Sequence, residues 1–93
     1  MSRETKRIPE AALQALVDAG AILNAFIVED GDGQFHILCR SVKGIDHLIQ
    51  MKRGGDRRFK TIDAAAKLLR SMGINRITLH LSEYAPGNQP LLR

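Results

Sequence analysis

The sequence has few aromatic residues, a single cysteine and no long hydrophobic run. Aromatic side chains make up 4% of the 93 residues and tryptophan is absent, so the core must be aliphatic. Cys39 alone excludes an internal disulfide and favours a reducing compartment. No apolar run reaches the ~18 residues of a membrane span, and no apolar segment of a signal peptide follows MSRETKR. We therefore expect a cytoplasmic protein without membrane association.

Acidic residues are also in deficit. The 14 Lys and Arg outnumber the 10 Asp and Glu, which gives a net charge of +4. Such an excess favours acidic or phosphate-rich partners, nucleic acid among them. Hydrophobic residues make up 44%, enough for a folded domain. A domain of this size gains roughly 3–5 kcal/mol from its core, so a partner subunit would be a natural supplement.

Two amphipathic segments predict helices. The first begins at Pro9, whose missing N–H costs nothing at a helix start, and it ends before Gly20. The second is capped by Thr61, carries Leu69 in its buried stripe, and ends at Gly73 in a Schellman motif.

Segments rich in β-formers predict four strands, at Ile22–Glu29 and at residues 34–40, 47–53 and 76–81. The first two are joined by a DGDG hairpin turn. The sequence thus predicts a single α+β domain over residues 8–81, of order α-β-β-β-α-β, with a mainly antiparallel sheet packed with two helices. Residues 1–7 are expected to form a mobile basic arm and residues 82–93 a flexible tail.

The predicted strands carry apolar side chains on both faces of the sheet. If the helices cover one apolar set (Phe26, Val28, Phe35, Ile37, Ile49 and Met51), the other face receives a second set: Leu23, Ala25, Ile27, Leu38 and Leu48. Soluble proteins seldom leave such a face exposed. Either one helix covers each face or the second set is a dimer interface, and we predict a homodimer through it.

No motif indicates catalysis, a metal or a cofactor. The DGDG turn begins like a calcium loop, but Phe35 and Ser41 stand where that loop needs Gly and Glu, so a plain hairpin turn is the better interpretation. None of the histidines lies at ligand spacing from a cysteine or carboxylate: His36, His47 and His80. The Gly54-Gly55 pair lacks the Lys-Ser/Thr of a phosphate loop. We expect no catalytic residues, no metal and no cofactor.

One cluster favours a binding function. Five of the nine residues from Lys52 to Lys60 are cationic, and only Asp56 opposes them. Arginine forks beside a helix N-terminus suit phosphate groups. The candidate nucleic-acid-binding residues are Lys52, Arg53, Arg57, Arg58, Lys60 and Arg70. The alternative is a solvated basic edge that prevents aggregation.

The segments RIPEAALQALVDAG and RRFKTIDAAAKLLRSMGI resemble small partition-associated proteins of the ParC type, which plasmids and integrative elements of Gram-negative bacteria carry. The resemblance covers most of residues 7–81 and contains no catalytic motif. It implies an accessory protein of mobile DNA with no established enzymatic role, and it assigns no functional residues.

Together these features predict a non-enzymatic accessory protein that binds DNA, or a DNA-bound partition protein, through the basic segment. The element order is also similar to double-stranded-RNA-binding domains and to the arm-binding domains of integrases, so DNA and RNA both stay open. The alternative is a protein–protein adaptor that uses the apolar sheet face or the PLLR tail. A small nuclease would need an acid–base set that the sequence does not show.

Overall fold

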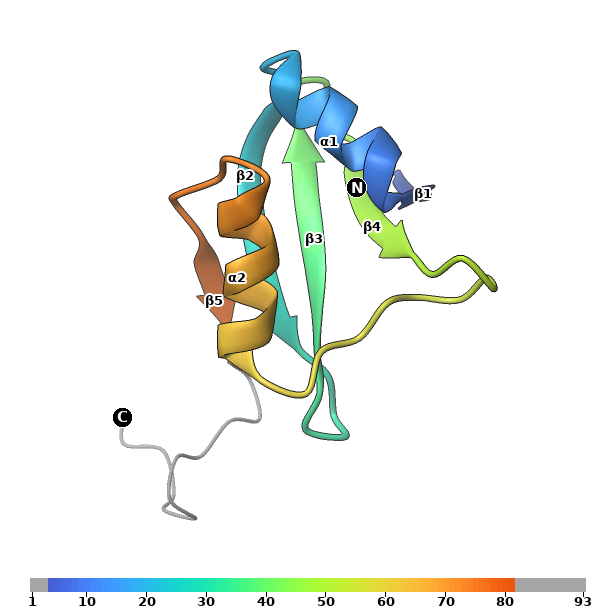
Figure 1. Ribbon diagram of the computed structural model, residues 1–93, viewed down its shortest axis with the longest axis vertical. Helices are drawn as coiled ribbons and strands as arrows, with labels where there is room; N and C mark the ends of the chain where they lie inside the picture. Colours follow the sequence, from blue (N-terminus) through green and yellow to red (C-terminus); the bar gives the residue numbers. More distant parts are fainter. Residues whose placement is uncertain (1–3, 82–93) are drawn as a thin grey trace.

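Five strands form one sheet in the computed structural model, which describes residues 4–81 (Figure 1). The sheet order is β1-β4-β3-β2-β5, and the strands are β1 (Thr5–Pro9), β2 (Ile22–Glu29), β3 (Phe35–Ser41), β4 (Asp46–Gln50) and β5 (Thr78–His80). The central β3 is antiparallel to β2 and β4, whereas each edge strand is parallel to its neighbour. The α+β class and the α-β-β-β-α-β order are confirmed, with one strand added in front. The sheet is mixed rather than mainly antiparallel.

The added strand is β1, which pairs in parallel with β4 from Thr5 opposite Asp46 to Pro9 opposite Gln50. The structure therefore places residues 5–7 in the sheet, where the sequence predicted a mobile arm. The segment TKRIP has only Ile8 as an apolar anchor, packed against the core, and so carries no strand periodicity of its own. Residues 1–3 and the predicted tail over 82–93, including PLLR, lie outside the described residues.

The helices are α1 (Glu10–Asp18) and α2 (Ile62–Ser71). Both helices lie where the sequence indicated, except that Pro9 is the extended N-cap of α1 and the last residue of β1 rather than the first helical residue. The Thr61 hydroxyl accepts a hydrogen bond from the Ala64 N–H at 3.0 Å, which caps α2. At its other end Gly73 has a φ of 101°, and the Ile74 N–H donates to the Leu69 carbonyl at 3.0 Å, as a Schellman ending requires. No helix within residues 4–81 is long and apolar enough to cross a membrane.

Both helices cover the same face of the sheet (Figure 1). α1 connects β1 to β2 and α2 connects β4 to β5, and each connection passes two strands in the same direction along the sheet. Because crossovers between parallel strands are almost always right-handed, both helices are carried to one side. Leu13 of α1 and Leu69 of α2 are fully buried in one core, and Gln14 donates to the Met72 carbonyl at 3.0 Å across the two helices. Within residues 4–81, no helix lies on the other face of the sheet.

The side chains of β2 point the opposite way from the sequence prediction. Ala25 and Ile27, predicted in the dimer face, are buried under the helices, 4% and 0% exposed, whereas Phe26 and Val28 lie on the other face. The reason is the length of the hairpin connection. Its loop contains five residues rather than four, closed by the Asp30 N–H donating to the Gln34 carbonyl at 2.7 Å. Glu29 therefore pairs with Phe35, and a slip of one residue reverses every side chain of the strand.

The other members of the predicted dimer face keep their expected direction or lie at its margin. Leu38 and Leu48 are directly opposite each other on the uncovered face, and both are half-buried. Leu23 is 63% exposed beside a register irregularity at the start of β2. The uncovered face therefore has an apolar centre made of four residues: Phe26, Val28, Leu38 and Leu48.

Candidate nucleic-acid interface

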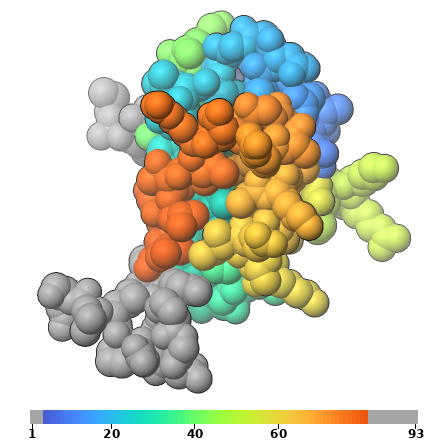
Figure 2. All heavy atoms as spheres, turned by 60° about the vertical axis from the view of Figure 1, so that its left-hand side comes forward, coloured from blue at the N-terminus to red at the C-terminus, as the bar shows by residue number. Residues whose placement is uncertain are grey.

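A glycine hairpin carries the first two predicted binding residues away from the body of the protein. After β4 the chain turns through residues 51–55, closed by the Met51 N–H donating to the Gly55 carbonyl at 2.9 Å. Gly54 and Gly55 have φ values of 89° and 80°, a left-handed conformation that residues with a side chain rarely adopt. We call residues 51–55 the basic hairpin. It stands out at the side of the molecule in the ribbon and in the space-filling view (Figures 1 and 2).

The cations of the basic hairpin are exposed. Lys52 and Arg53 occupy its tip, and no carboxylate of residues 4–81 lies within ion-pair distance of either. Both charges are therefore open to an external anion. Lys60 and Arg70 are also exposed and, among the described residues, form no ion pair. Lys60 lies just before α2 and Arg70 lies in its last turn, so they are separated from the hairpin along the chain and in the fold.

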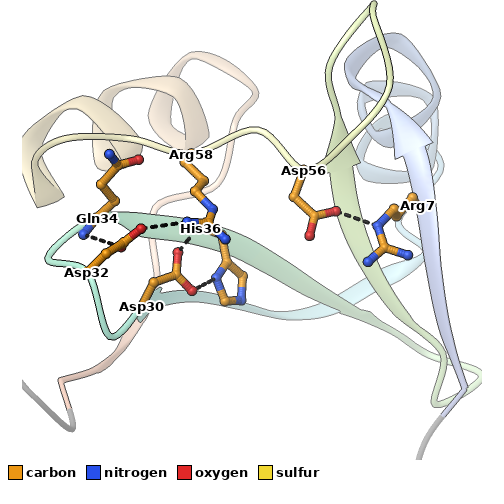
Figure 3. A network of polar contacts seen from close by, with 7 residues as sticks. All are labelled: Arg7, Asp30, Asp32, Gln34, His36, Asp56 and Arg58. Carbon is orange, nitrogen blue, oxygen red and sulfur yellow. Dashed lines mark hydrogen bonds and ion pairs between the residues drawn. The ribbon is translucent and has the colours of Figure 1, made fainter.

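Arg57 and Arg58, by contrast, are engaged within the protein. The returning segment is extended, bridging Asp56 to Gln50 and Phe59 to Phe35, so successive side chains point to opposite sides. Arg57 pairs with Glu10 at the start of α1, and its guanidinium lies 5.1 Å from the centre of the buried Phe59 ring. Arg58 points the other way and pairs with Asp32 at 2.6 Å (Figure 3). Arg57 and Arg58 of the predicted cluster thus point to opposite sides of this segment.

A network of polar contacts surrounds Arg58 on the uncovered face (Figure 3). Its Nε lies 3.7 Å from Asp30, and Asp30 also contacts Nδ1 of His36 at 2.8 Å. The Asp32 carboxylate accepts a further hydrogen bond from the Gln34 N–H at 3.1 Å, which holds the DGDG turn in shape and confirms the turn interpretation. Farther along the same segment, Asp56 pairs with Arg7 of β1.

The fold gives His36 a carboxylate partner and buries His47, and the sequence predicted neither. The sequence placed no carboxylate at ligand spacing from His36, yet Asp30 lies beside it because the hairpin returns the chain at that point. Asp30 begins the DGDG turn and His36 lies just after it, so their spacing was the sequence signal that could have indicated this contact. His47, placed on a strand without a role, is 8% exposed on the helix-covered face opposite Cys39, and its Nδ1 has no hydrogen-bond partner within the described part of the chain. His80 lies with its ring 5.3 Å from that of Phe26.

A groove runs between the start of α1 and the basic hairpin. It has a volume of about 770 Å³. Met51, which is 46% exposed, contributes apolar surface, and Lys52 contributes positive charge at its edge. The Arg57 guanidinium and the Glu10 carboxylate meet in the wall, so the groove is mixed in charge, and Lys52 is the cation there without a carboxylate partner in residues 4–81.

Three comparisons relate the chain to known proteins. A family model described as ParC-like matches residues 8–88 of the 93, which confirms the resemblance seen in the sequence. A search of curated proteins found no match, and a search of solved structures found none either.

Proposed function

Because the chain belongs to the ParC-like family, and is in that sense a partition-related protein, we propose that it is a non-enzymatic accessory factor that binds DNA through the basic hairpin. The observation that supports DNA contact is the state of Lys52 and Arg53. They are exposed at a projecting tip, with no carboxylate from residues 4–81 to neutralise them.

Phosphate contact suits the chemistry of this tip. Lysine offers a mobile ammonium and arginine a planar donor fork, and both bind phosphate oxygens without reading a base sequence. The two glycines carry no side chain, so the hairpin backbone can approach a phosphate strand closely. Lys60 and Arg70 are second-rank contacts on the side of α2.

The internal ion pairs reduce the number of phosphate contacts that we expect. Arg57 and Arg58 would have to leave Glu10 and Asp32 before they could bind DNA. Two to three contacts from the remaining cations give a slope of log affinity against log salt of about −2 to −3. Binding should therefore be weak, salt-sensitive and tolerant of sequence, which fits an accessory factor that acts beside another DNA-bound protein.

A matched pair of charge variants tests the proposal. Lys52→Glu with Arg53→Glu removes the hairpin charge, and Lys43→Glu with Lys67→Glu makes the same change in net charge at exposed sites elsewhere. Fluorescence anisotropy with labelled duplex DNA at low and moderate salt should show at least about tenfold weaker binding for the hairpin variant, corresponding to two lost contacts. The control variant should bind nearly as the wild type does. Equal losses would mean that net charge alone drives binding, and no binding by wild type at micromolar protein in low salt would reject the DNA proposal.

The same titration with duplex RNA decides between the two nucleic acids.

A protein–protein adaptor is the second candidate, and a different observation favours it. The uncovered face of the sheet has a half-buried apolar centre that the two helices do not cover. An adaptor would keep its partner when the hairpin charge is reversed.

A further inference from the structure

The uncovered face of the sheet has the make-up of a protein interface. Leu38 lies at its centre, directly opposite Phe26 on β2 and Leu48 on β4, so the apolar side chains are contiguous across three strands. Val28 extends this centre along β2. All four side chains are half-buried rather than covered. We call this surface the open face.

Two flat polarisable groups border the apolar centre at Phe26, one from β3 and one from β5. The Arg40 guanidinium lies 4.9 Å from the centre of the Phe26 ring, and the His80 ring lies on the same phenyl group at 5.3 Å. Arg40 is held in place by Asp46, whose carboxylate accepts from its Nε at 2.8 Å. Aromatic side chains and arginine are the residues enriched at the centres of protein interfaces. The side chains are thus already ordered for contact with a flat partner.

The charges of the open face nearly cancel one another. Three arginines of the described residues point to this side, and each has a carboxylate: Arg7 with Asp56, Arg40 with Asp46, and Arg58 with Asp32. A fourth carboxylate, Asp30, lies between Arg58 and His36. The whole chain has a net charge of +4, so its positive excess lies away from the open face. A face with this near balance of charge gives neither DNA nor an acidic protein an electrostatic advantage. It does suit a surface with the same balance of signs.

From this balance we propose that the occupant of the open face is a second copy of the same chain, in a two-fold symmetric dimer. Two copies of an apolar face with nearly balanced charge meet with little like-charge repulsion, and each brings both arginines and carboxylates to the rim. In an isologous interface every contact occurs twice, and residues near the axis meet their own symmetry mates. Leu38 is placed for that position, because it lies in the middle of the face on the central strand. The inference does not depend on DNA binding by the hairpin.

Sedimentation equilibrium tests the dimer with one disruptive variant and one control. Leu38→Glu would place a carboxylate at the centre of each copy's interface, whereas Val42→Glu changes a 60% exposed residue in the turn after β3. Two buried carboxylates per dimer should weaken self-association by at least about 100-fold. Wild type and Val42→Glu should sediment as dimers at micromolar concentration, and Leu38→Glu as the 10.3 kDa chain. A wild-type monomer, or a dimer that survives Leu38→Glu, would overturn the proposal.

Cysteine cross-linking gives an answer even if Leu38→Glu does not fold. Cys39 is fully buried, so the natural thiol gives no background in the folded protein. Under mild oxidation Leu38→Cys should form a disulfide-linked dimer, and Val42→Cys should stay monomeric. Equal cross-linking of the two variants, or none at position 38, would show that the open face is not a contact between copies.

Discussion

The Cys39 thiol lies on the helix-covered face of β3, where no part of it is exposed to solvent. Burial raises its pKa to about 12, because the thiolate would have to lie in an apolar core. The folded protein therefore holds this thiol protonated and unreactive at neutral pH. Its role is packing, as a small apolar side chain between Ala25 and His47 on the neighbouring strands.

This raised pKa predicts a loss of stability in alkali. An unfolded cysteine titrates near 9, so the unfolded chain releases its proton first as the pH rises. The contribution of Cys39 is fully present below pH 9 and is lost as the pH rises through about 12. Between about pH 8 and pH 10.5 the wild type should lose about 2 kcal/mol more than Cys39→Ala does. Urea unfolding of both proteins at the two pH values measures the difference, and parallel losses would contradict the buried thiol.

At the scale of elements, α2 is attached to the sheet through one fully buried stripe. Leu69 is 0% exposed, and its carbonyl also accepts the hydrogen bond that ends the helix. Leu69→Ala should cost about 2–5 kcal/mol, since it removes core contacts and leaves a cavity. Lys67→Ala, on the exposed side of the same helix, should change stability by less than about 0.5 kcal/mol. Similar urea midpoints for the two variants would mean that α2 is not packed as described.

The sequence was sufficient for those elements whose ends are marked by side-chain chemistry. Thr61 and Gly73 fixed the limits of α2, and clean alternation fixed β3 and its inward residues Phe35 and Ile37. It was not sufficient for β2, because ILNAFIVE is apolar on both faces and only the loop length selects one. β1 was missed for a related reason, since its position depends on pairing with β4, which lies about 40 residues later in the chain.

The sequence predicted which basic residues make up the candidate site, but not how they are arranged. The sequence located the basic segment, and the structure keeps Lys52 and Arg53 exposed. The partners of Arg57 and Arg58 come from positions 47 and 26 residues away, and no local pattern connects them. Whether a cation is open to a ligand depends on those distant carboxylates, which only the fold brings close.

At the scale of the whole molecule, the two crossovers explain why one face of the sheet is uncovered. Both connections run in the same direction with the same hand, so both helices add to one layer. A protein built this way has its core on one side of the sheet, and the apolar side chains on the other side stay uncovered unless a partner binds there. A dimer through the open face would also present two basic hairpins at once, which would raise DNA affinity by avidity without any new contact.

The ion pairs of Arg57 and Arg58 should support the fold rather than DNA binding. Each connects the segment after the basic hairpin to a distant part of the chain, α1 in one case and the DGDG turn in the other. Arg58 and Asp32 are about half-exposed, so their coupling should be about 0.2–1 kcal/mol and should weaken in salt. A double-mutant cycle of Arg58→Ala and Asp32→Ala, followed by urea unfolding at low and high salt, measures it.

DNA titrations of the same variants test whether Arg58 supports the fold or binds DNA. Asp32→Ala releases Arg58 from its main carboxylate, so it should leave DNA affinity unchanged or raise it slightly. Arg58→Ala should lower stability with little loss of DNA affinity, in contrast to the hairpin variant at positions 52 and 53. If Arg58→Ala instead weakens DNA binding as strongly as the hairpin variant does, Arg58 must exchange its carboxylates for phosphate on binding, and the interface extends across the DGDG turn.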